Sequence, residues 1–196
     1  FIIVLLNVEG NRDSEPVIGS RIGEREDLCA LYEELKKKFP DSLEYKFIES
    51  APSDKIAEIV EETYYEWEKL YKYKPDYVLH YIGHSILDNE IGKLVVKDAV
   101  TGKPDWEEDK TFASRFNSES LNIKQPSLVC FQACDSAKIG SYGDELRGVA
   151  YEFTKINIPA VIGMQNEINT PNSNAFFEYF YQNILKGNDV AEAVTA

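Results

Sequence analysis

Short apolar runs alternate along this chain with longer segments in which apolar residues recur every three or four positions. The short runs predict buried strands, and the longer period predicts amphipathic helices that cover them. The five strands expected from this pattern occupy residues 1–6, 44–48, 77–82, 127–131 and 158–164. The three longest helices expected from it occupy residues 28–39, 54–70 and 172–185, with Pro40 closing the first and Gly187 the third.

Weaker patterns lie between these elements. Residues 92–98 predict one strand of a hairpin, residues 111–121 and 144–155 predict short helices, and residues 100–110 predict a charged loop around Trp106. Because strands and helices alternate from end to end, we expect an α/β fold with a mainly parallel sheet between two helical layers. Residues 1–196 are expected to form one domain, since no linker or repeat divides them.

Composition narrows the class of protein. A chain of 196 residues that is 43% hydrophobic can bury one sizeable core, and its net charge of −13 argues against a nucleic-acid-binding face. Three cysteines without paired spacing predict a reducing compartment, and therefore a cytoplasmic location. The first apolar run is too short for a signal peptide or membrane span. Since the chain starts at Phe1 and stops within a segment that predicts the start of a helix, we expect it to be part of a longer polypeptide.

Two of the expected strands lead into residues that can carry chemistry. One continues into Gly83-His84-Ser85, and the other continues into Gln132-Ala133-Cys134-Asp135. Sites on parallel sheets form where strands end, and neighbouring strands lie about 4.8 Å apart. If the two strands are neighbours, His84 and Cys134 can meet as a base and a nucleophile.

Other chemical interpretations of these histidines and cysteines are weaker. A serine nucleophile at Ser85 would need a histidine later in the chain, but His80 and His84 are the only two. A zinc site from both histidines with Cys130 and Cys134 fails on strands, where positions i and i+4 lie about 13 Å apart. We interpret Cys29 and Cys130 as small buried hydrophobic residues. His80 is expected to have a structural role.

The residues alone leave two alternatives to a Cys–His dyad open. Cys134 can be a buried structural cysteine like the other two. A flavodoxin-like ligand-binding or receiver domain would place acids after the first strand, where Asn7, Glu9 and Asp13 supply a weak version. The sequence contains no P-loop and no dinucleotide-binding motif, so no nucleotide cofactor is expected.

The motifs around Cys134 resemble a known family. Gln132-Ala133-Cys134 matches the start of the caspase signature, and His84 lies 50 residues upstream, as that signature requires. The chain resembles CHAT-domain cysteine peptidases, which belong to the caspase-like superfamily with metacaspases, separases and gingipains. This resemblance spans nearly the whole chain. The motifs that carry it are Ile82-Gly83-His84-Ser85, Ala133-Cys134-Asp135-Ser136, residues 161–165, the aromatic helix at residues 176–181 and the segment at residues 187–194.

The resemblance implies a caspase-like three-layer αβα sandwich and a cysteine endopeptidase that forms a thioester. It assigns catalysis to His84 and Cys134, and an oxyanion hole to the backbone N–H groups of Ser85 and Cys134. Ser85 stands where the family usually has glycine, which leaves a catalytically inactive interaction module as the alternative. No metal or organic cofactor is implied.

The resemblance also implies how substrates are selected and how the enzyme is used. Gln132, Arg21 and Asp135 match places where caspase-like enzymes bind substrate. Because of Asp135 and the excess of acids, we expect an apolar or basic residue before the cut, although Arg21 resembles an aspartate-binding arginine. The expected partners are a protein substrate and a regulatory or sensor domain or subunit. Family members of this kind are regulated proteases of prokaryotic defence or cell-death signalling.

Overall fold

The computed structural model describes residues 2–7, 22–49, 51–167 and 169–195, and its centre is a five-stranded sheet. The strands run parallel in the order β10-β7-β3-β1-β2. Their bounds are β1 (Ile2–Asn7), β2 (Glu44–Glu49), β3 (Tyr77–Ile82), β7 (Leu128–Gln132) and β10 (Val161–Ile162). Every residue of β3 and β7 is buried, which is why these strands read as continuous apolar runs.

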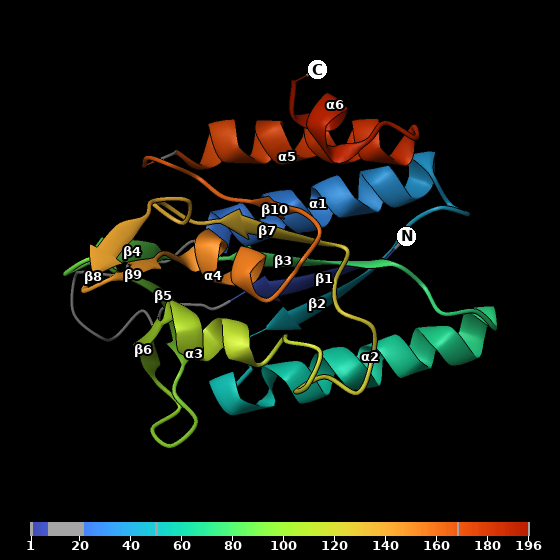
Figure 1. Cartoon of the computed structure of the whole chain (residues 1–196). Helices are drawn as coiled ribbons and strands as arrows, with labels where there is room; N and C mark the ends of the chain where they lie inside the picture. Colours follow the sequence, from blue (N-terminus) through green and yellow to red (C-terminus); the bar gives the residue numbers. More distant parts are fainter. Residues whose placement is uncertain (1, 8–21, 50, 168, 196) are drawn as a thin grey trace.

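Helices cover both faces of this sheet, as the alternating pattern predicts (Figure 1). On one face lie α1 (Ile22–Lys38), α5 (Thr170–Leu185) and α6 (Val190–Thr195). On the other face lie α2 (Ile56–Tyr71), which follows a short 3-10 turn (Ser53–Lys55), with α3 (Asp109–Ser114) and α4 (Val149–Lys155). Successive residues of β7 alternate between the two cores: Cys130 packs with the first set of helices and Phe131 with the second. The three-layer αβα arrangement expected from the sequence is confirmed.

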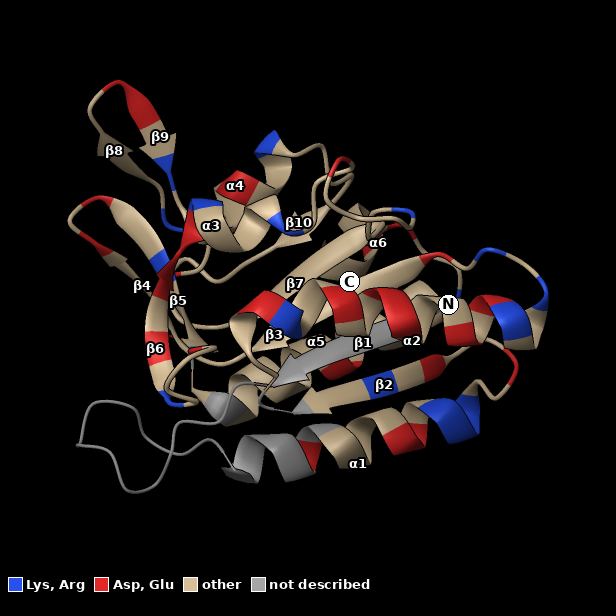
Figure 2. Ribbon diagram, turned by 90° about the horizontal axis from the view of Figure 1, so that it is seen from below, with Lys and Arg blue, Asp and Glu red and all other residues tan. Residues whose placement is uncertain are grey.

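Two small antiparallel sheets extend from this body. One contains β4 (Ser85–Asp88), β5 (Ile91–Lys97) and β6 (Pro104–Glu108), and the other is the hairpin of β8 (Gly140–Tyr142) and β9 (Glu145–Arg147). Figure 2 shows them side by side at one end of the molecule. The backbone N–H of Ser141 in β8 donates a hydrogen bond of 3.0 Å to Oε2 of Glu90, which lies in the turn between β4 and β5. The two small sheets therefore contact each other beside the main sheet.

A buried ion pair connects the two small sheets to helix α3. Asp109 is fully buried, and its Oδ1 accepts a hydrogen bond from Arg147 Nε at 3.1 Å. Its Oδ2 accepts from the backbone N–H of Gly92 at 3.2 Å. A Cβ at Gly92 would lie 2.6 Å from the backbone nitrogen of Val149, so only glycine allows this approach. One carboxylate thus joins β5, β9 and the start of α3.

Four expectations from the pattern are wrong. The helix expected at residues 111–121 ends at Ser114, because α3 spans Asp109–Ser114. Residues 100–110 are not simply a loop, because β6 occupies part of them, with Trp106 paired to Val95. β6 is an exposed edge strand, and its sequence lacks the alternation of apolar and polar residues that predicts a strand. The expected helix at residues 144–155 splits into β9 and a shorter α4 at Gly148, where a Cβ would meet the carbonyl oxygen of Lys138 at 2.3 Å. The strand at residues 158–164 is only two residues long.

The second helix, α2, buries Ile56, Val60, Thr63 and Tyr64. Leu70 is 65% exposed, whereas Tyr64 is buried against Tyr77. None of the described helices is both long enough and apolar enough to cross a membrane.

Candidate active site

His84 and Cys134 lie at the same edge of the main sheet. β3 and β7 are adjacent and parallel, with Ile82 aligned to Gln132, and each candidate follows its aligned residue by two positions. Both side chains are partly exposed, while the residues before them in β3 and β7 are buried. The condition set by the sequence, that the two strands be neighbours, is therefore met.

Hydrogen bonds join the two segments directly. The N–H of Gly83 donates to the carbonyl oxygen of Gln132 at 3.2 Å, which continues the pairing beyond the ends of the strands. The hydroxyl of Ser85 donates to the carbonyl oxygen of Cys134. The residue that departs from the family pattern thus links the histidine segment to the cysteine segment.

The loop that carries Cys134 is a tight turn held by one buried serine. Ser136 is fully buried, and its Oγ donates to the carbonyl oxygen of Ala133 at 2.8 Å and accepts from the N–H of Met164 at 2.8 Å. Asp135 has a φ angle of 59°, a left-handed conformation that aspartate tolerates better than most residues. The turn fixes the backbone on both sides of Cys134.

The backbone at Ser85 is compatible with a donor role. Ser85 begins β4 in an extended conformation and has no positive φ angle. The N–H of Val95 donates to the carbonyl oxygen of His84 at 3.0 Å, so Ser85 and Leu94 form a non-hydrogen-bonded pair of the antiparallel ladder. In such a pair the N–H of Ser85 points away from β5. Serine at position 85 therefore has an allowed backbone conformation and keeps its N–H as a hydrogen-bond donor.

The other histidine and cysteine of these strands form a buried polar cluster. His80 is aligned with Cys130, and both are fully buried. The hydroxyls of Tyr32 and Tyr181 each lie 3.0 Å from His80 Nδ1. Burial lowers the pKa of His80 to about 3, opposed by a smaller effect of the Gln132 side chain, and burial raises the pKa of Cys130 to about 12. Both groups are therefore neutral at pH 7, which agrees with the structural roles expected for them.

The three predicted substrate-binding residues have different placements. Gln132 is fully buried, and its Nε2 donates to Asn174 Oδ1 of α5 at 2.7 Å, so its side chain does not line a surface in this conformation. Asp135 is partly buried, and its Oδ1 lies 2.9 Å from Nζ of Lys138. Arg21 lies outside the described residues. Substrate binding by these residues stays a prediction.

Sequence reasoning missed two residues that hold the backbone of this site. Ser136 was noted only as part of a family motif, although a serine two positions after a candidate nucleophile can bind the backbone of a turn. Tyr81 belongs to a segment that predicts a buried apolar strand, but its hydroxyl lies 3.1 Å from the carbonyl oxygen of His84. No pattern in the sequence indicates that contact.

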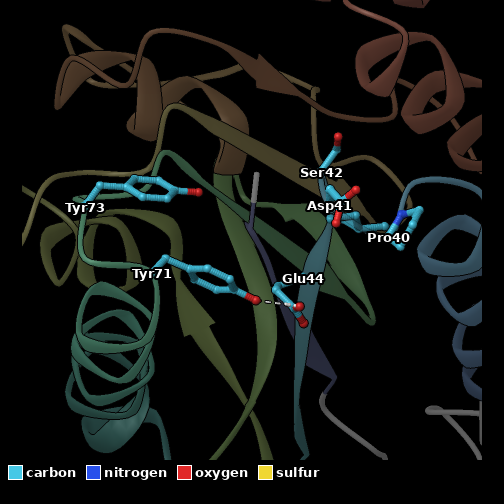
Figure 3. Close-up of a pocket in the computed structure, with 7 residues that line it drawn as sticks. Pro40, Asp41, Ser42, Glu44, Tyr71 and Tyr73 are labelled. Carbon is cyan, nitrogen blue, oxygen red and sulfur yellow. Dashed lines mark hydrogen bonds between the residues drawn. The ribbon is translucent and has the colours of Figure 1, made fainter.

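A pocket of about 470 Å³ lies at the opposite, amino-terminal edge of the sheet (Figure 3). Its lining includes Asp41, Tyr71 and Tyr73 with Glu44, the first residue of β2. Tyr71 donates a hydrogen bond to Glu44 Oε1 at 2.6 Å, which raises the pKa of Tyr71 to about 12. The pocket is remote from the strand ends that carry His84 and Cys134. Within the described ranges no three His, Cys, Asp or Glu side chains gather as a metal site.

Comparisons with known proteins identify the family and the fold. The family model of the CHAT domain matches residues 55–196. Among solved structures, the Drosophila initiator caspase Dronc matches with a TM-score of 0.56 at 12% identity, over 99% of this chain and 69% of the caspase chain. At that identity the likeness concerns the fold alone. A search of curated proteins found no match.

Proposed function

Because this chain belongs to the CHAT domain family and has a caspase-like fold, we propose that it is a cysteine endopeptidase with Cys134 as nucleophile and His84 as base. The observation that carries the proposal is the alignment of Ile82 with Gln132, which brings both residues to one edge of the sheet. Their partial exposure gives a substrate access to both.

In the first half of the reaction, His84 takes the proton of the Cys134 thiol. The thiolate sulfur then attacks the carbonyl carbon of the scissile bond, and the carbonyl oxygen becomes an oxyanion. The N–H groups of Ser85 and Cys134 stabilise this oxyanion. As the carbon–nitrogen bond breaks, the protonated His84 gives its proton to the leaving amine, and a thioester remains on Cys134.

In the second half, His84 accepts a proton from water, and the resulting hydroxide attacks the thioester carbon. The same two N–H groups stabilise the second oxyanion. Breaking the carbon–sulfur bond releases the carboxylic acid product and returns the proton to the Cys134–His84 pair. No step requires a metal or an organic cofactor.

The alternative of an inactive interaction module rests on Ser85 in place of glycine. The direction of the Ser85 N–H, away from β5, supports the active form instead. The Ser85 hydroxyl also joins the two catalytic segments, a contact that glycine could not make.

The substrate is a protein, cut after an apolar or basic residue. A basic substrate side chain could pair with Asp135 in place of Lys138. A substrate with a carboxylate before the cut is disfavoured by the net charge of −13. The family resemblance supports a regulated protease of the cytoplasm, in prokaryotic defence or cell-death signalling, that a sensor domain or subunit switches on.

The test is cleavage of a proteome-derived peptide library, with new N-termini identified by mass spectrometry. The wild-type chain should generate them and the Cys134→Ala variant should not. If both give the same fragments, the proposal fails, and it also fails if the wild type gives none. The same library read with Asp135→Ala measures the preference before the cut.

A further inference from the structure

Two peptide groups carry the N–H donors of the proposed oxyanion hole, and each also carries a carbonyl. The N–H of Ser85 shares its peptide group with the carbonyl of His84, and the N–H of Cys134 shares its group with the carbonyl of Ala133. In a planar trans peptide the C=O and N–H point in opposite directions. Whatever holds the carbonyl on one side therefore sets the direction of the N–H on the other.

The carbonyl of Ala133 is held by Ser136. Its Oγ donates to Ala133 at 2.8 Å, and the same Oγ accepts from the N–H of Met164 at 2.8 Å. Ser136 is fully buried, so water does not compete for its hydroxyl. The carbonyl of Ser136 accepts from the N–H of Ala150 in α4 at 2.9 Å, which anchors the serine itself to the second core.

The carbonyl of His84 is held from two sides. The N–H of Val95 in β5 donates to it at 3.0 Å. The hydroxyl of Tyr81 shares one hydrogen between this carbonyl, at 3.1 Å, and the carbonyl of Val95, at 2.7 Å. Tyr81 is 1% exposed, and a Cβ at Gly83 would lie 2.5 Å from its hydroxyl oxygen. Glycine at position 83 thus makes room for the tyrosine to reach past it.

We propose that Ser136 and Tyr81 are positioning residues, which fix from behind the two peptide groups whose N–H atoms stabilise the oxyanion. This inference rests on the proposed peptidase function and goes further by naming side chains that act on the transition state without touching it. Preorganised donors stabilise charge well only if they need not reorient as it develops. Each residue acts through a carbonyl that faces away from the substrate.

The chain offers a matched control for each variant. Tyr77 lies four residues before Tyr81 on the same strand, is 1% exposed, and its hydroxyl has no hydrogen-bond partner among the described residues. Ser173 in α5 is 1% exposed, and its hydroxyl also lacks a partner in the described part of the chain. Tyr77→Phe and Ser173→Ala therefore remove the same atoms from equally buried sites that do not touch the two peptide groups.

The experiment compares Ser136→Ala and Tyr81→Phe with these controls in three assays. The first is turnover of a fluorogenic peptide taken from the cleaved library sequences. The second is inhibition by the matching peptide aldehyde, whose adduct with Cys134 is tetrahedral and carries the oxyanion. The third is alkylation of Cys134 by iodoacetamide, a displacement in which no oxyanion forms.

Ser136→Ala should lower kcat by about 10-fold or more, and Tyr81→Phe should lower it by about 3-fold. Both decreases are smaller than the decrease in kcat of about 10²- to 10³-fold that follows the complete loss of one donor. Aldehyde affinity should weaken by the same factors, while KM and the alkylation rate change less than about 2-fold. Variants that match their controls would overturn the inference, as would alkylation that falls with turnover. If Ser136→Ala does not fold by circular dichroism, Tyr81→Phe against Tyr77→Phe decides.

The outcome for the wild type separates this inference from the proposed function. A wild-type chain that neither cleaves nor reacts at Cys134 contradicts the peptidase itself. A wild type that does both, with variants indistinguishable from their controls, contradicts only the positioning role.

Discussion

A histidine and a cysteine occur together twice along two neighbouring segments, once within β3 and β7 and once just after these strands end, and only the second pair is partly exposed. His80 and Cys130 are aligned in the middle of β3 and β7, and His84 and Cys134 follow four residues later at the strand ends. The inner pair is fully buried, and the outer pair is partly exposed. Residue type and strand alignment are matched, so burial is what distinguishes them.

Burial changes the protonation chemistry of the inner pair. It lowers the pKa of His80 to about 3 and raises the pKa of Cys130 to about 12. At pH 7 a thiol with that pKa is ionised in only about 1 in 10⁵ molecules, and the thiolate is the nucleophile. A histidine and a cysteine on neighbouring strands therefore do not make a catalytic pair unless the strands end there.

The largest expected effect is on catalysis by the outer pair. Cys134→Ala and His84→Ala should each lower cleavage of the fluorogenic peptide by at least about 10³-fold, because in the proposed mechanism Cys134 bonds to the substrate and His84 exchanges a proton with it. Cys130→Ala should stay within about 3-fold of the wild type. A Cys134→Ala variant that folds and still cleaves would break the comparison.

The inner pair, His80 and Cys130, should affect the stability of the fold rather than the activity. The folded-state pKa of His80 lies below its ordinary value of 6.5, so below about pH 6.5 the unfolded chain binds a proton that the folded chain does not. Stability from this group is full above pH 6.5 and falls as the pH drops toward 3, with a slope of about 1.4 kcal/mol per pH unit.

Urea unfolding of the wild type and of His80→Gln between pH 7 and pH 5 measures this slope. The variant should lose less stability on acidification than the wild type, and Cys134→Ala, which keeps His80, should lose as much as the wild type. Equal slopes in wild type and His80→Gln would mean that His80 is not held neutral by burial.

The smallest expected effect concerns the contact between the two catalytic segments. Ser85→Ala removes the hydroxyl that donates to the carbonyl of Cys134 but keeps the backbone N–H. One neutral hydrogen bond contributes about 0.5–1.5 kcal/mol, so kcat/KM should fall by about 2- to 12-fold. Ser85→Gly, which restores the usual family residue, should fall similarly. A Ser85→Gly variant that is faster than the wild type would show that serine impairs the site.

Where strands are buried on both faces, the sequence was sufficient to predict them. Residues 77–82 match β3, and the aromatic helix matches α5 closely, with Gly187 at a φ angle of 99° after its end. Exposed or short elements were missed, because β6 is a polar edge strand and β10 takes its pairing from β7 rather than from its own pattern.

The candidate site was predicted less evenly. The position of His84 and Cys134 after two neighbouring strands could be predicted, because a local pattern can show a strand end. The contacts of Ser136 with Met164 and of Tyr81 with Val95 depend on how distant segments pack, which no local pattern shows. The burial of Gln132 beneath α5 has the same origin, since Asn174 comes 42 residues later.

The most direct test of the difference between the two pairs is the alkylation rate of each cysteine in the folded chain. Iodoacetamide at pH 7, followed by peptide mapping, should modify Cys134 first and leave Cys130 unmodified until the chain unfolds. In His84→Ala the rate at Cys134 should fall, because the variant removes the base proposed for Cys134, while the rate at Cys29, which lies on α1, should stay unchanged. Alkylation of Cys130 as fast as Cys134, or a Cys134 rate that does not depend on His84, would contradict the account.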